Sequence, residues 1–497
     1  MQVTRRVRLL CQSSFVGTLM AAFMTPVCAL AAPAAAEVRT YPAPAGLEND
    51  PDYSVQVNGK DVFVYKSPVA GIASFEFEGA AEVVITSRRD PKWVDVRPLS
   101  RRVLPVTNGN KISFKLSKAG NFSVELNGQP KRHPLFLFAN PIEKNAPLPN
   151  APGVHYFAAG QVHKPGLIEV KDNETVYIAG GAVVEGSIQG KGVSNVKILG
   201  RGILDGTNLR ELLKGKKVRG HFISLRDCKN IEVEGVVLSN GQAWEVVPVN
   251  CENLTFTNLK IVSDAGGDDG IDIVRSRNVK ISKSFFHTKD DNIVVKAIFD
   301  YPTEVTSKDI EVWDSVFWNA AWGNAIEIGF ELRSDVISNI YYHDCDVIHV
   351  EDGAVFSIHN GDNATISNVR FSNVRVEDST QKLFDFAIFL SQYSADRPES
   401  KEERERRYLH GAWDGVLTVP AEDLAKHAAF RGKIRDVVID NVQVVDGVFP
   451  FSLFWGYDPQ HNIEGVVIKR LSVHGKPLRN ARDARFVLKD ATVKFAN

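Results

Sequence analysis

The chain has 497 residues, of which 59 are basic and 60 acidic, so its formal net charge is only −1. This balance gives no electrostatic reason to expect nucleic acid or an anionic membrane as a partner. The length is sufficient for one large domain and one smaller domain with a substantial core.

Residues 1–36 are predicted to be a secretory signal peptide. A basic start is followed by an apolar stretch from about Phe15 to Met24, and Ala29-Leu30-Ala31 then provides a cleavage pattern of small residues. The apolar stretch is shorter than the roughly 20 residues that a membrane-spanning helix needs. No later stretch of the sequence is apolar enough to span a membrane. We therefore expect an exported protein, periplasmic or extracellular after cleavage.

Cleavage would leave three cysteines, Cys228, Cys251 and Cys345. An odd number argues against a disulfide framework, and a chain of this size does not need one. Cys228 and Cys251 occupy similar places in adjacent repeats. We expect buried free thiols that stack on one another, with a disulfide between these two as the lesser alternative.

Residues 37–142 contain short runs in which apolar and polar residues alternate, such as Tyr53–Val57 and Ala81–Ile85. Turn signals, including Asn58-Gly59 and Asn127-Gly128, lie between the runs, because Asn and Gly adopt positive φ at low cost. This pattern predicts an N-terminal all-β domain, most simply a β-sandwich. A proline-rich stretch then predicts a linker over residues 143–153.

A long-period repeat occupies residues 154–497. Each unit begins with Asn or Asp followed by alternating apolar residues, as in Asn195-Val196-Lys197-Ile198 and Asn278-Val279-Lys280-Ile281. Strand-containing units of roughly 22 to 30 residues without an amphipathic helix predict a parallel β-helix. A leucine-rich repeat lacks its leucines here, and a propeller needs about 40 or more residues per blade. We expect the asparagines to form an inward ladder at a turn, with a sugar-binding row as the lesser alternative.

One gap between repeat units is much longer than the others and predicts an insertion at about 379–432. It contains the charge run Lys401–Arg407, which is typical of a solvated helix. The alternative is that the insertion forms one wall of a cleft.

Two acidic clusters lie about one repeat apart. The first is Asp268-Asp269-Gly270 with Asp272 behind it, and the second is Asp290-Asp291. Stacked coils at roughly 4.8 Å would place both clusters on one face. Neighbouring carboxyls raise one another's pKa, so a protonated acid can stand beside an ionised base, as glycosidic-bond hydrolysis requires. Calcium binding and turn capping are the alternatives.

The acidic clusters and their surroundings resemble the core signature of the polygalacturonase family, glycoside hydrolase family 28. The matching segments are Asp269-Gly270-Ile271-Asp272-Ile273 and Asp290-Asp291-Asn292-Ile293. The resemblance implies a right-handed parallel β-helix and hydrolysis with inversion, without a cofactor or metal. By position it implies that Asp290 is the general acid and that Asp269 and Asp291 activate water. A β-sandwich before the β-helix also resembles the dextranase-like family 49.

Two departures from the family 28 pattern concern substrate choice. Asn324 stands where the family has the histidine of Gly-His-Gly, and Ser357-Ile358-His359 stands at the Arg-Ile-Lys segment that grips a uronate carboxylate. The sequence therefore favours a neutral α-glycan such as dextran. A polygalacturonase or rhamnogalacturonan-type pectin hydrolase is the alternative, followed by a β-helix polysaccharide lyase and a non-catalytic glycan-binding β-helix.

Further residues around the clusters are candidates for binding a polysaccharide or oligosaccharide substrate. Glu327 is a candidate acceptor for a sugar hydroxyl, and Trp322 is a candidate stacking surface, although each has an ordinary structural alternative. The full set of predicted substrate-binding residues is Asp268, Lys296, Asn324, Glu327, His359 and Trp322.

Overall fold

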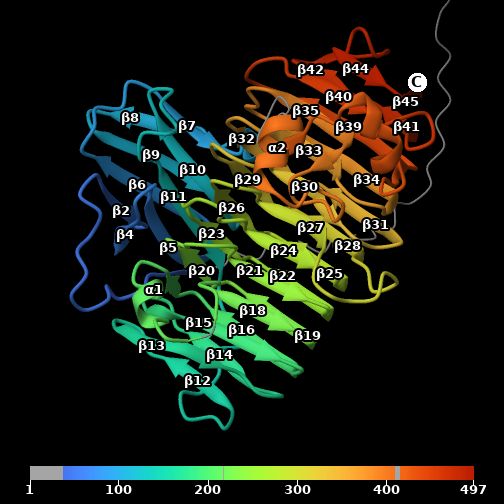
Figure 1. Cartoon of the computed structure of the whole chain (residues 1–497). Helices are drawn as coiled ribbons and strands as arrows, with labels where there is room; N and C mark the ends of the chain where they lie inside the picture. Colours follow the sequence, from blue (N-terminus) through green and yellow to red (C-terminus); the bar gives the residue numbers. More distant parts are fainter. Residues whose placement is uncertain (1–36, 217, 409–414, 497) are drawn as a thin grey trace, which may run out of the picture. The chain divides into compact units, whose positions relative to one another are not determined.

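The computed structural model describes residues 37–216, 218–408 and 415–496, so the predicted signal peptide lies outside the described residues. Residues 36–497 form one compact unit built almost entirely of strands (Figure 1). Among the described residues, no helix has both the length and the apolar character needed to cross a membrane.

The N-terminal part of the described chain is a sandwich of two sheets. Val55, Ile85, Phe75 and Leu137, from both sheets, meet in one buried core, as the alternating sequence runs predict. One sheet pairs antiparallel throughout, and the other contains a parallel pair between β5 and β11. The strands of the two sheets are β2 (Tyr53–Val57), β3 (Lys60–Val62), β6 (Ala81–Ser87), β8 (Val106–Asn108) and β9 (Lys111–Leu116), and then β1 (Glu37–Arg39), β4 (Val64–Lys66), β5 (Gly71–Glu78), β7 (Val94–Arg97), β10 (Gly120–Leu126) and β11 (Leu135–Pro141).

The remainder of the chain is a parallel β-helix, which confirms the predicted fold class. Strand pairing between successive coils produces three stacks, A, B and C. Stack A contains β12 (Val154–Phe157), β14 (Thr175–Ile178), β16 (Ser194–Gly200), β19 (Lys229–Glu234), β22 (Glu252–Thr257), β25 (Arg277–Ser282), β28 (Lys308–Trp313), β31 (Val336–His343), β34 (Thr365–Val376), β38 (Lys433–Arg435), β39 (Val437–Val444), β41 (Ile463–Lys469) and β45 (Ala491–Ala496).

Stacks B and C complete each coil, and β13 and β15 contribute to both. Stack B contains β13 (Val162–Glu169), β15 (Val183–Lys191), β17 (Ile203–Asp205), β20 (Val237–Ser239), β23 (Lys260–Val262), β26 (Phe285–Thr288), β29 (Val316–Asn319), β32 (Asp346–Val350) and β42 (Ser472–Val473). Stack C contains β18 (Ile223–Arg226), β21 (Val246–Val249), β24 (Ile271–Val274), β27 (Ile293–Ala297), β30 (Ile326–Leu332), β33 (Ala354–Asn360), β35 (Lys382–Ile388), β40 (Phe451–Trp455) and β44 (Phe486–Lys489).

The predicted insertion at 379–432 begins later than expected. Its first part is β35, a regular strand of stack C whose Phe384 and Phe386 enter the core of the β-helix. The chain leaves the coil only after Ile388 and returns at β38. The departure contains β36 (Leu390–Ser391), α2 (Lys401–Arg407), β37 (Val416–Leu417) and α3 (Leu424–Ala428); α1 (Leu209–Leu212) and β43 (Lys476–Pro477) lie elsewhere.

The asparagine ladder exists, but it is exposed and not inward as predicted. Asn195, Asn230, Asn253 and Asn278 all have positive φ, between 53° and 60°. Each side-chain amide donates to the side-chain carbonyl of the preceding coil over 2.6–3.0 Å. The left-handed backbone at this turn points the amides outward, where they satisfy one another along the ladder.

The cysteines agree with the preferred prediction. Cys228, Cys251 and Cys345 are all buried and free, and Cys228 lies on Cys251 in the next coil, with 3.4 Å between its amide nitrogen and the Cys251 sulfur.

The sandwich packs against the outer face of stack B. Phe136 and Phe138 of β11 lie against Phe285, with ring centres 4.9 and 5.4 Å away. A fully buried lysine, Lys260 of β23, lies in the same surface and donates to the Asn140 side chain over 2.6 Å. Burial lowers the pKa of Lys260 well below its usual value. The apolar contact and this polar pair together hold the two domains against one another.

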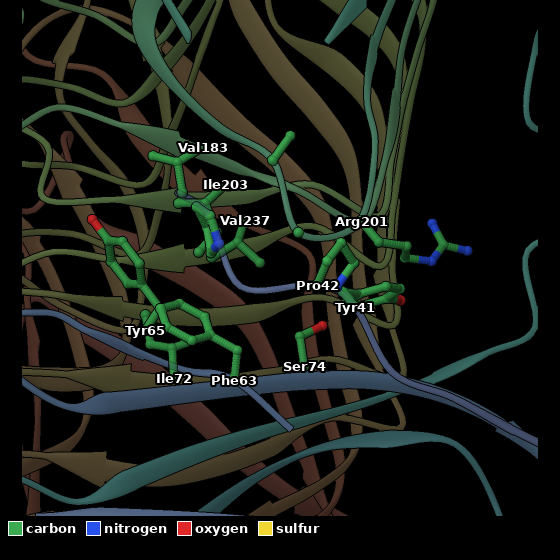
Figure 2. A pocket seen from close by; sticks show the side chains of 13 residues that line it. Tyr41, Pro42, Phe63, Tyr65, Ile72, Ser74, Val183, Arg201, Ile203 and Val237 are labelled. Carbon is green, nitrogen blue, oxygen red and sulfur yellow. The ribbon is translucent and has the colours of Figure 1, made fainter. Parts of the chain in front are cut away.

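A small cavity lies in this contact (Figure 2). Tyr41 and Pro42 of the segment that follows β1, Phe63 and Tyr65 of the sandwich and Ile203 of the β-helix line it. Its volume is about 30 Å³, which suits one or two water molecules and not a sugar. The cavity is therefore a packing feature of the domain contact.

The substitution Asn140→Ala is expected to destabilise the domain contact. It removes the acceptor that binds Lys260 over 2.6 Å and leaves the buried amino group with the Gly235 carbonyl at 3.1 Å, which should cost about 1–3 kcal/mol and lower Tm. The double variant Asn140→Ala/Lys260→Met should recover part of this loss because it also removes the buried amino group that has lost its partner. The exposed substitution Lys197→Met serves as control in thermal unfolding. An unchanged Tm in Asn140→Ala would contradict the assigned role of the pair.

Candidate functional site

The predicted catalytic residues lie in the turns that lead from stack B to stack C. Asp269 and Asp291 each lie two residues before the first paired residue of their stack C strands, β24 and β27. Trp244, in the preceding coil, and Asn324, in the following coil, occupy the same position relative to β21 and β30. His221 occupies it before β18. Five successive coils thus align these side chains in one row along the β-helix, here called the turn row.

The structure brings the three predicted catalytic aspartates together. One carboxylate oxygen from each of Asp269, Asp290 and Asp291 lies within 4.8 Å of the others. This limit applies to one oxygen of each carboxyl, so it is a different quantity from the roughly 6.5–9.5 Å between the acid and base carboxyls of an inverting glycosidase. Asp269 is buried, while Asp290 and Asp291 are partly exposed, so the cluster opens to solvent through the second pair.

Asp268 holds the loop that carries Asp290. Its side chain is fully buried and accepts backbone N–H groups of Ala265, Lys289 and Asp290 over 2.9–3.1 Å. Burial raises the pKa of Asp268 to about 6. Asp268, predicted to bind substrate, therefore has a structural role: it holds Asp290 in position.

Lys296 neutralises the inner side of the cluster. Its Nζ lies 3.1 Å from Asp269 and 3.2 Å from Asp272, and 4.0 Å from the centre of the Trp244 ring. Burial acts to lower the pKa of Lys296, but Asp269 and Asp272 raise it well above its usual value. The ammonium therefore stays charged beside the two carboxyl groups.

Two cluster carboxyls bind protons unusually strongly. Burial and, after it, the charge of Asp269 raise the pKa of Asp290 from 3.8 to about 7. Burial, followed by the charges of Asp269 and Asp290, raises the pKa of Asp291 well above its usual range. These groups interact, so their protons belong to the cluster as a whole. Near neutral pH the cluster contains both a proton donor and a carboxylate.

Asn324 and Glu327 connect the cluster to the next coil. The amide N–H of Asn324 donates to Asp291 over 2.7 Å, and its side chain donates to Glu327 over 3.0 Å. Glu327 also lies 3.2 Å from His359 Nδ1 and is almost fully buried. Asn324 thus fixes the orientation of Asp291.

His359 lies beneath the surface and away from the opening. It is 1% exposed and is held between Glu327 and Asp385, 3.3 Å from the latter. Burial acts to lower its pKa, but Glu327 and Asp385 raise it to about 9, so the ring is protonated. The cation balances two buried carboxylates, a role for which direct substrate contact is not needed.

Trp322 lies at the rim of the cluster, where it is 52% exposed. Its ring faces Lys289 at 4.8 Å, and the next residue, Gly323, packs directly on the aspartates. A Cβ at Gly323 would lie 2.4 Å from the Asp291 nitrogen and 2.6 Å from an Asp290 oxygen, and its φ is +63°. Glycine is therefore required there, and it places an exposed aromatic ring beside the carboxyls.

The structure also contains site residues that the sequence analysis missed. Trp244 contacts Lys296, and Glu245 behind it is fully buried against Ser263, Asp268 and Asp269. Burial raises the pKa of Glu245 well above its usual value, so it is neutral. The sequence offered one signal for Trp244. It lies two residues before β21, as Asp269 lies two residues before β24 in the next coil, so the same count places both in the turn row.

The three aspartates can also, by arrangement, hold a divalent cation. Lys296 already supplies a positive charge 3.1 Å from Asp269, and a cation between the aspartates would be repelled by it. The donor set therefore suits proton chemistry better than metal binding.

Comparisons with known proteins support the motif resemblance. Residues 159–387, which include the three aspartates, match the model described as glycosyl hydrolases family 28. An endo-polygalacturonase of Pectobacterium carotovorum subsp. carotovorum is 24% identical over 188 residues, 37% of this chain and 45% of that protein. Polygalacturonase-2 of Solanum lycopersicum is 26% identical over 179 residues, 35% of each chain. The chain thus spans less than half the length of these curated relatives.

The fold has a counterpart among solved structures. Dex49A from Penicillium minioluteum aligns with a TM-score of 0.54 at 14% identity and covers 92% of this chain and 96% of its own. The coverage includes the sandwich as well as the β-helix. The predicted resemblance to family 28, with a family 49-like layout, is confirmed.

Asp290→Asn is expected to make the fold less sensitive to pH. The folded state raises the pKa of Asp290 to about 7, so this group favours folding at low pH and loses that contribution as pH rises through about 7. Wild-type Tm should fall between pH 6 and pH 8. The Tm of Asp290→Asn should fall less over this range. At pH 8 its free energy of unfolding should exceed that of wild type by about 1–3 kcal/mol. Asp264→Asn, an exposed neighbour, is the control, and an equal fall in both variants would exclude this explanation.

Proposed function

We propose that the protein is an inverting glycoside hydrolase that cleaves an extracellular polysaccharide or oligosaccharide. The observation that carries the proposal is the convergence of Asp269, Asp290 and Asp291 within 4.8 Å in a segment that matches glycosyl hydrolases family 28. The export predicted from the N-terminal sequence fits a polymer substrate that does not enter the cell, and we propose a periplasmic or extracellular location.

Asp290 is the proposed general acid. A pKa of about 7 keeps its proton near neutral pH, and its carboxyl is partly exposed where a glycosidic oxygen can approach. It donates the proton to that oxygen as the bond to the anomeric carbon breaks. The leaving sugar departs as an alcohol, and Asp290 becomes a carboxylate.

Asp269 and Asp291 are the proposed water-binding pair. A water that donates both hydrogens over bonds of about 2.8 Å reaches two oxygens roughly 4.6 Å apart, close to the 4.8 Å limit that contains these carboxyls. The water attacks the anomeric carbon from the face opposite the leaving group and passes its proton to Asp269, whose carboxyl lies 3.1 Å from the Lys296 ammonium. Attack from that face inverts the anomeric centre.

A neutral sugar suits the unit at the cleavage centre. The surroundings are rich in carboxyl groups, which disfavour a second anion. The nearest cations are already paired: Lys296 with Asp269 and Asp272, and Lys289 with the Trp322 ring. This supports the neutral glycan expected from the missing Arg-Ile-Lys segment, with an α-glucan such as dextran as one example. Trp322 is the proposed stacking surface.

The lyase alternative requires a base that removes a sugar proton. Lys296 is the cation nearest the aspartates, but Asp269 and Asp272 raise its pKa well above the usual value, so it does not become a neutral base. The site therefore favours hydrolysis over elimination.

Asp290→Asn should reduce kcat by about 10²–10⁴-fold, because it removes the proton donor and keeps the shape of the side chain. A panel of dextran, other α-glucans, polygalacturonate and rhamnogalacturonan is scored for new reducing ends, and NMR follows the first anomer released. Trp93→Phe, in an exposed position of the sandwich, is the matched control. An ultraviolet-absorbing product abolished by chelator would instead indicate a calcium-dependent lyase. Retention of the anomer would overturn the water-attack assignment.

The pH profile should have its alkaline limb near pH 7. Hydrolysis needs Asp290 protonated, so kcat/KM should fall about tenfold per pH unit above its pKa of about 7. Initial rates from pH 5 to pH 9 on the best panel substrate measure this limb. Activity that is constant up to pH 9 would exclude Asp290 as the acid.

A further inference from the structure

A groove of about 310 Å³ is lined by residues of β18 and β21 in stack C. Figure 1 labels these two strands. Ser224, Val247 and Val249 belong to its floor, and Phe299 lines it from the segment that follows β27. The complete lining is Gln189, Val218, Arg219, His221, Ser224, Leu225, Arg226, Trp244, Val247, Val249 and Phe299. None of the functions assigned above uses this groove.

Trp244 lies between the groove and the cleavage centre and contacts both. Trp244 lines the groove and also places its ring 4.0 Å from Lys296, which binds Asp269. His221 lies in the coil before Trp244, and its Nδ1 is 2.6 Å from the Trp244 carbonyl oxygen. Both belong to the turn row that continues through Asp269. A glycan chain that lies along this row therefore reaches the groove one or two coils away from the scissile bond.

The charge of the groove is opposite to that of the cleavage centre. Arg219 and Arg226 are among its lining residues, and no Asp or Glu is. Arg226 is oriented by Tyr301, whose hydroxyl it binds over 3.1 Å, and by Phe299, whose ring centre is 5.0 Å from the guanidinium. Arg219 is exposed, and its side chain makes no hydrogen bond or ion pair with another residue that the structure describes. Burial lowers the pKa of His221, so the positive charge comes from the arginines.

We propose that this groove is a subsite for an acidic sugar unit, and that Arg219 and Arg226 select its anionic group. The inference rests on the proposed glycosidase function and refines its substrate: a heteroglycan that presents a neutral unit at the aspartates and a carboxylate- or sulfate-bearing unit at the groove. A guanidinium binds either anion through paired N–H donors, and Val247 and Val249 provide an apolar surface for the ring. Dextran fits the centre but leaves both arginines without a ligand.

Binding to a catalytically silenced parent, Asp290→Asn, tests the subsite without turnover. The probes are rhamnogalacturonan oligosaccharides, which alternate neutral and acidic units, oligogalacturonates, dextran sulfate and dextran, measured by calorimetry. Arg219→Ala and Arg226→Gln, each in this parent, should weaken binding of an acidic probe by about tenfold or more, and raised salt should weaken parent binding in the same way. Arg370→Ala, at an exposed position of stack A, should have no effect.

The probes also separate the two anion chemistries. If the arginine variants lose affinity only for the uronate probes, the natural ligand group is a carboxylate. If they lose affinity only for dextran sulfate, it is a sulfate. Arg219→Ala removes an exposed side chain, so it tests the subsite even if Arg226→Gln folds poorly. Binding of dextran alone, or equal binding by the parent and Arg219→Ala, would overturn the proposal. If the wild type then hydrolysed dextran and Asp290→Asn showed the expected fall in kcat, the glycosidase function would stand without the subsite. Tight acidic binding without hydrolysis by the wild type would instead overturn the glycosidase function alone.

Discussion

Parallel strand pairing between successive coils determines which side chains become neighbours in this protein. A residue two positions before a stack C strand lies beside its counterpart in the next coil, whatever the length of chain between them. Trp244, Asp269, Asp291 and Asn324 become one row for this reason. Equivalent residues in successive coils are therefore spaced by roughly 4.8 Å. If the register of strand pairing shifted by one residue, the carboxyls of the turn row would point into the core.

The pairing also forces like charges together, and the protein offsets the resulting repulsion within the same stack. Lys296 reaches back one coil to Asp269 and Asp272, while His359 is held between Glu327 and Asp385 in the following coils. Protons offset the rest, since the pKa of Asp290 rises to about 7. An arrangement that costs folding free energy in this way is typical of sites in which strained electrostatics serve chemistry.

Much of this organisation is visible in the sequence, and the exceptions have identifiable causes. The repeat spacing and the Asp clusters predict the β-helix and the meeting of Asp269 with Asp291, because both follow from strand periodicity. The asparagine ladder was placed on the wrong side, since sequence spacing does not report the left-handed φ that turns Asn253 outward. The depth of His359 depends on Asp385, a partner one coil further along. Trp244 was missed because a tryptophan before a strand has no chemical signature of its own.

The division of the β-helix surface follows from the domain contact. Phe136 and Phe138 cover the apolar outer face of stack B, so that face is not available to a polymer. Stack A carries the exposed ladder of amides, whose donors are used in bonds to one another. Stack C remains, and along it the outward residues change from the basic groove near Arg226 to the acidic centre near Asp269. A polymer bound along this stack would meet two fields of opposite sign within a few coils. Such a surface discriminates by the order of charged and neutral units along a chain, which a uniform field does not do.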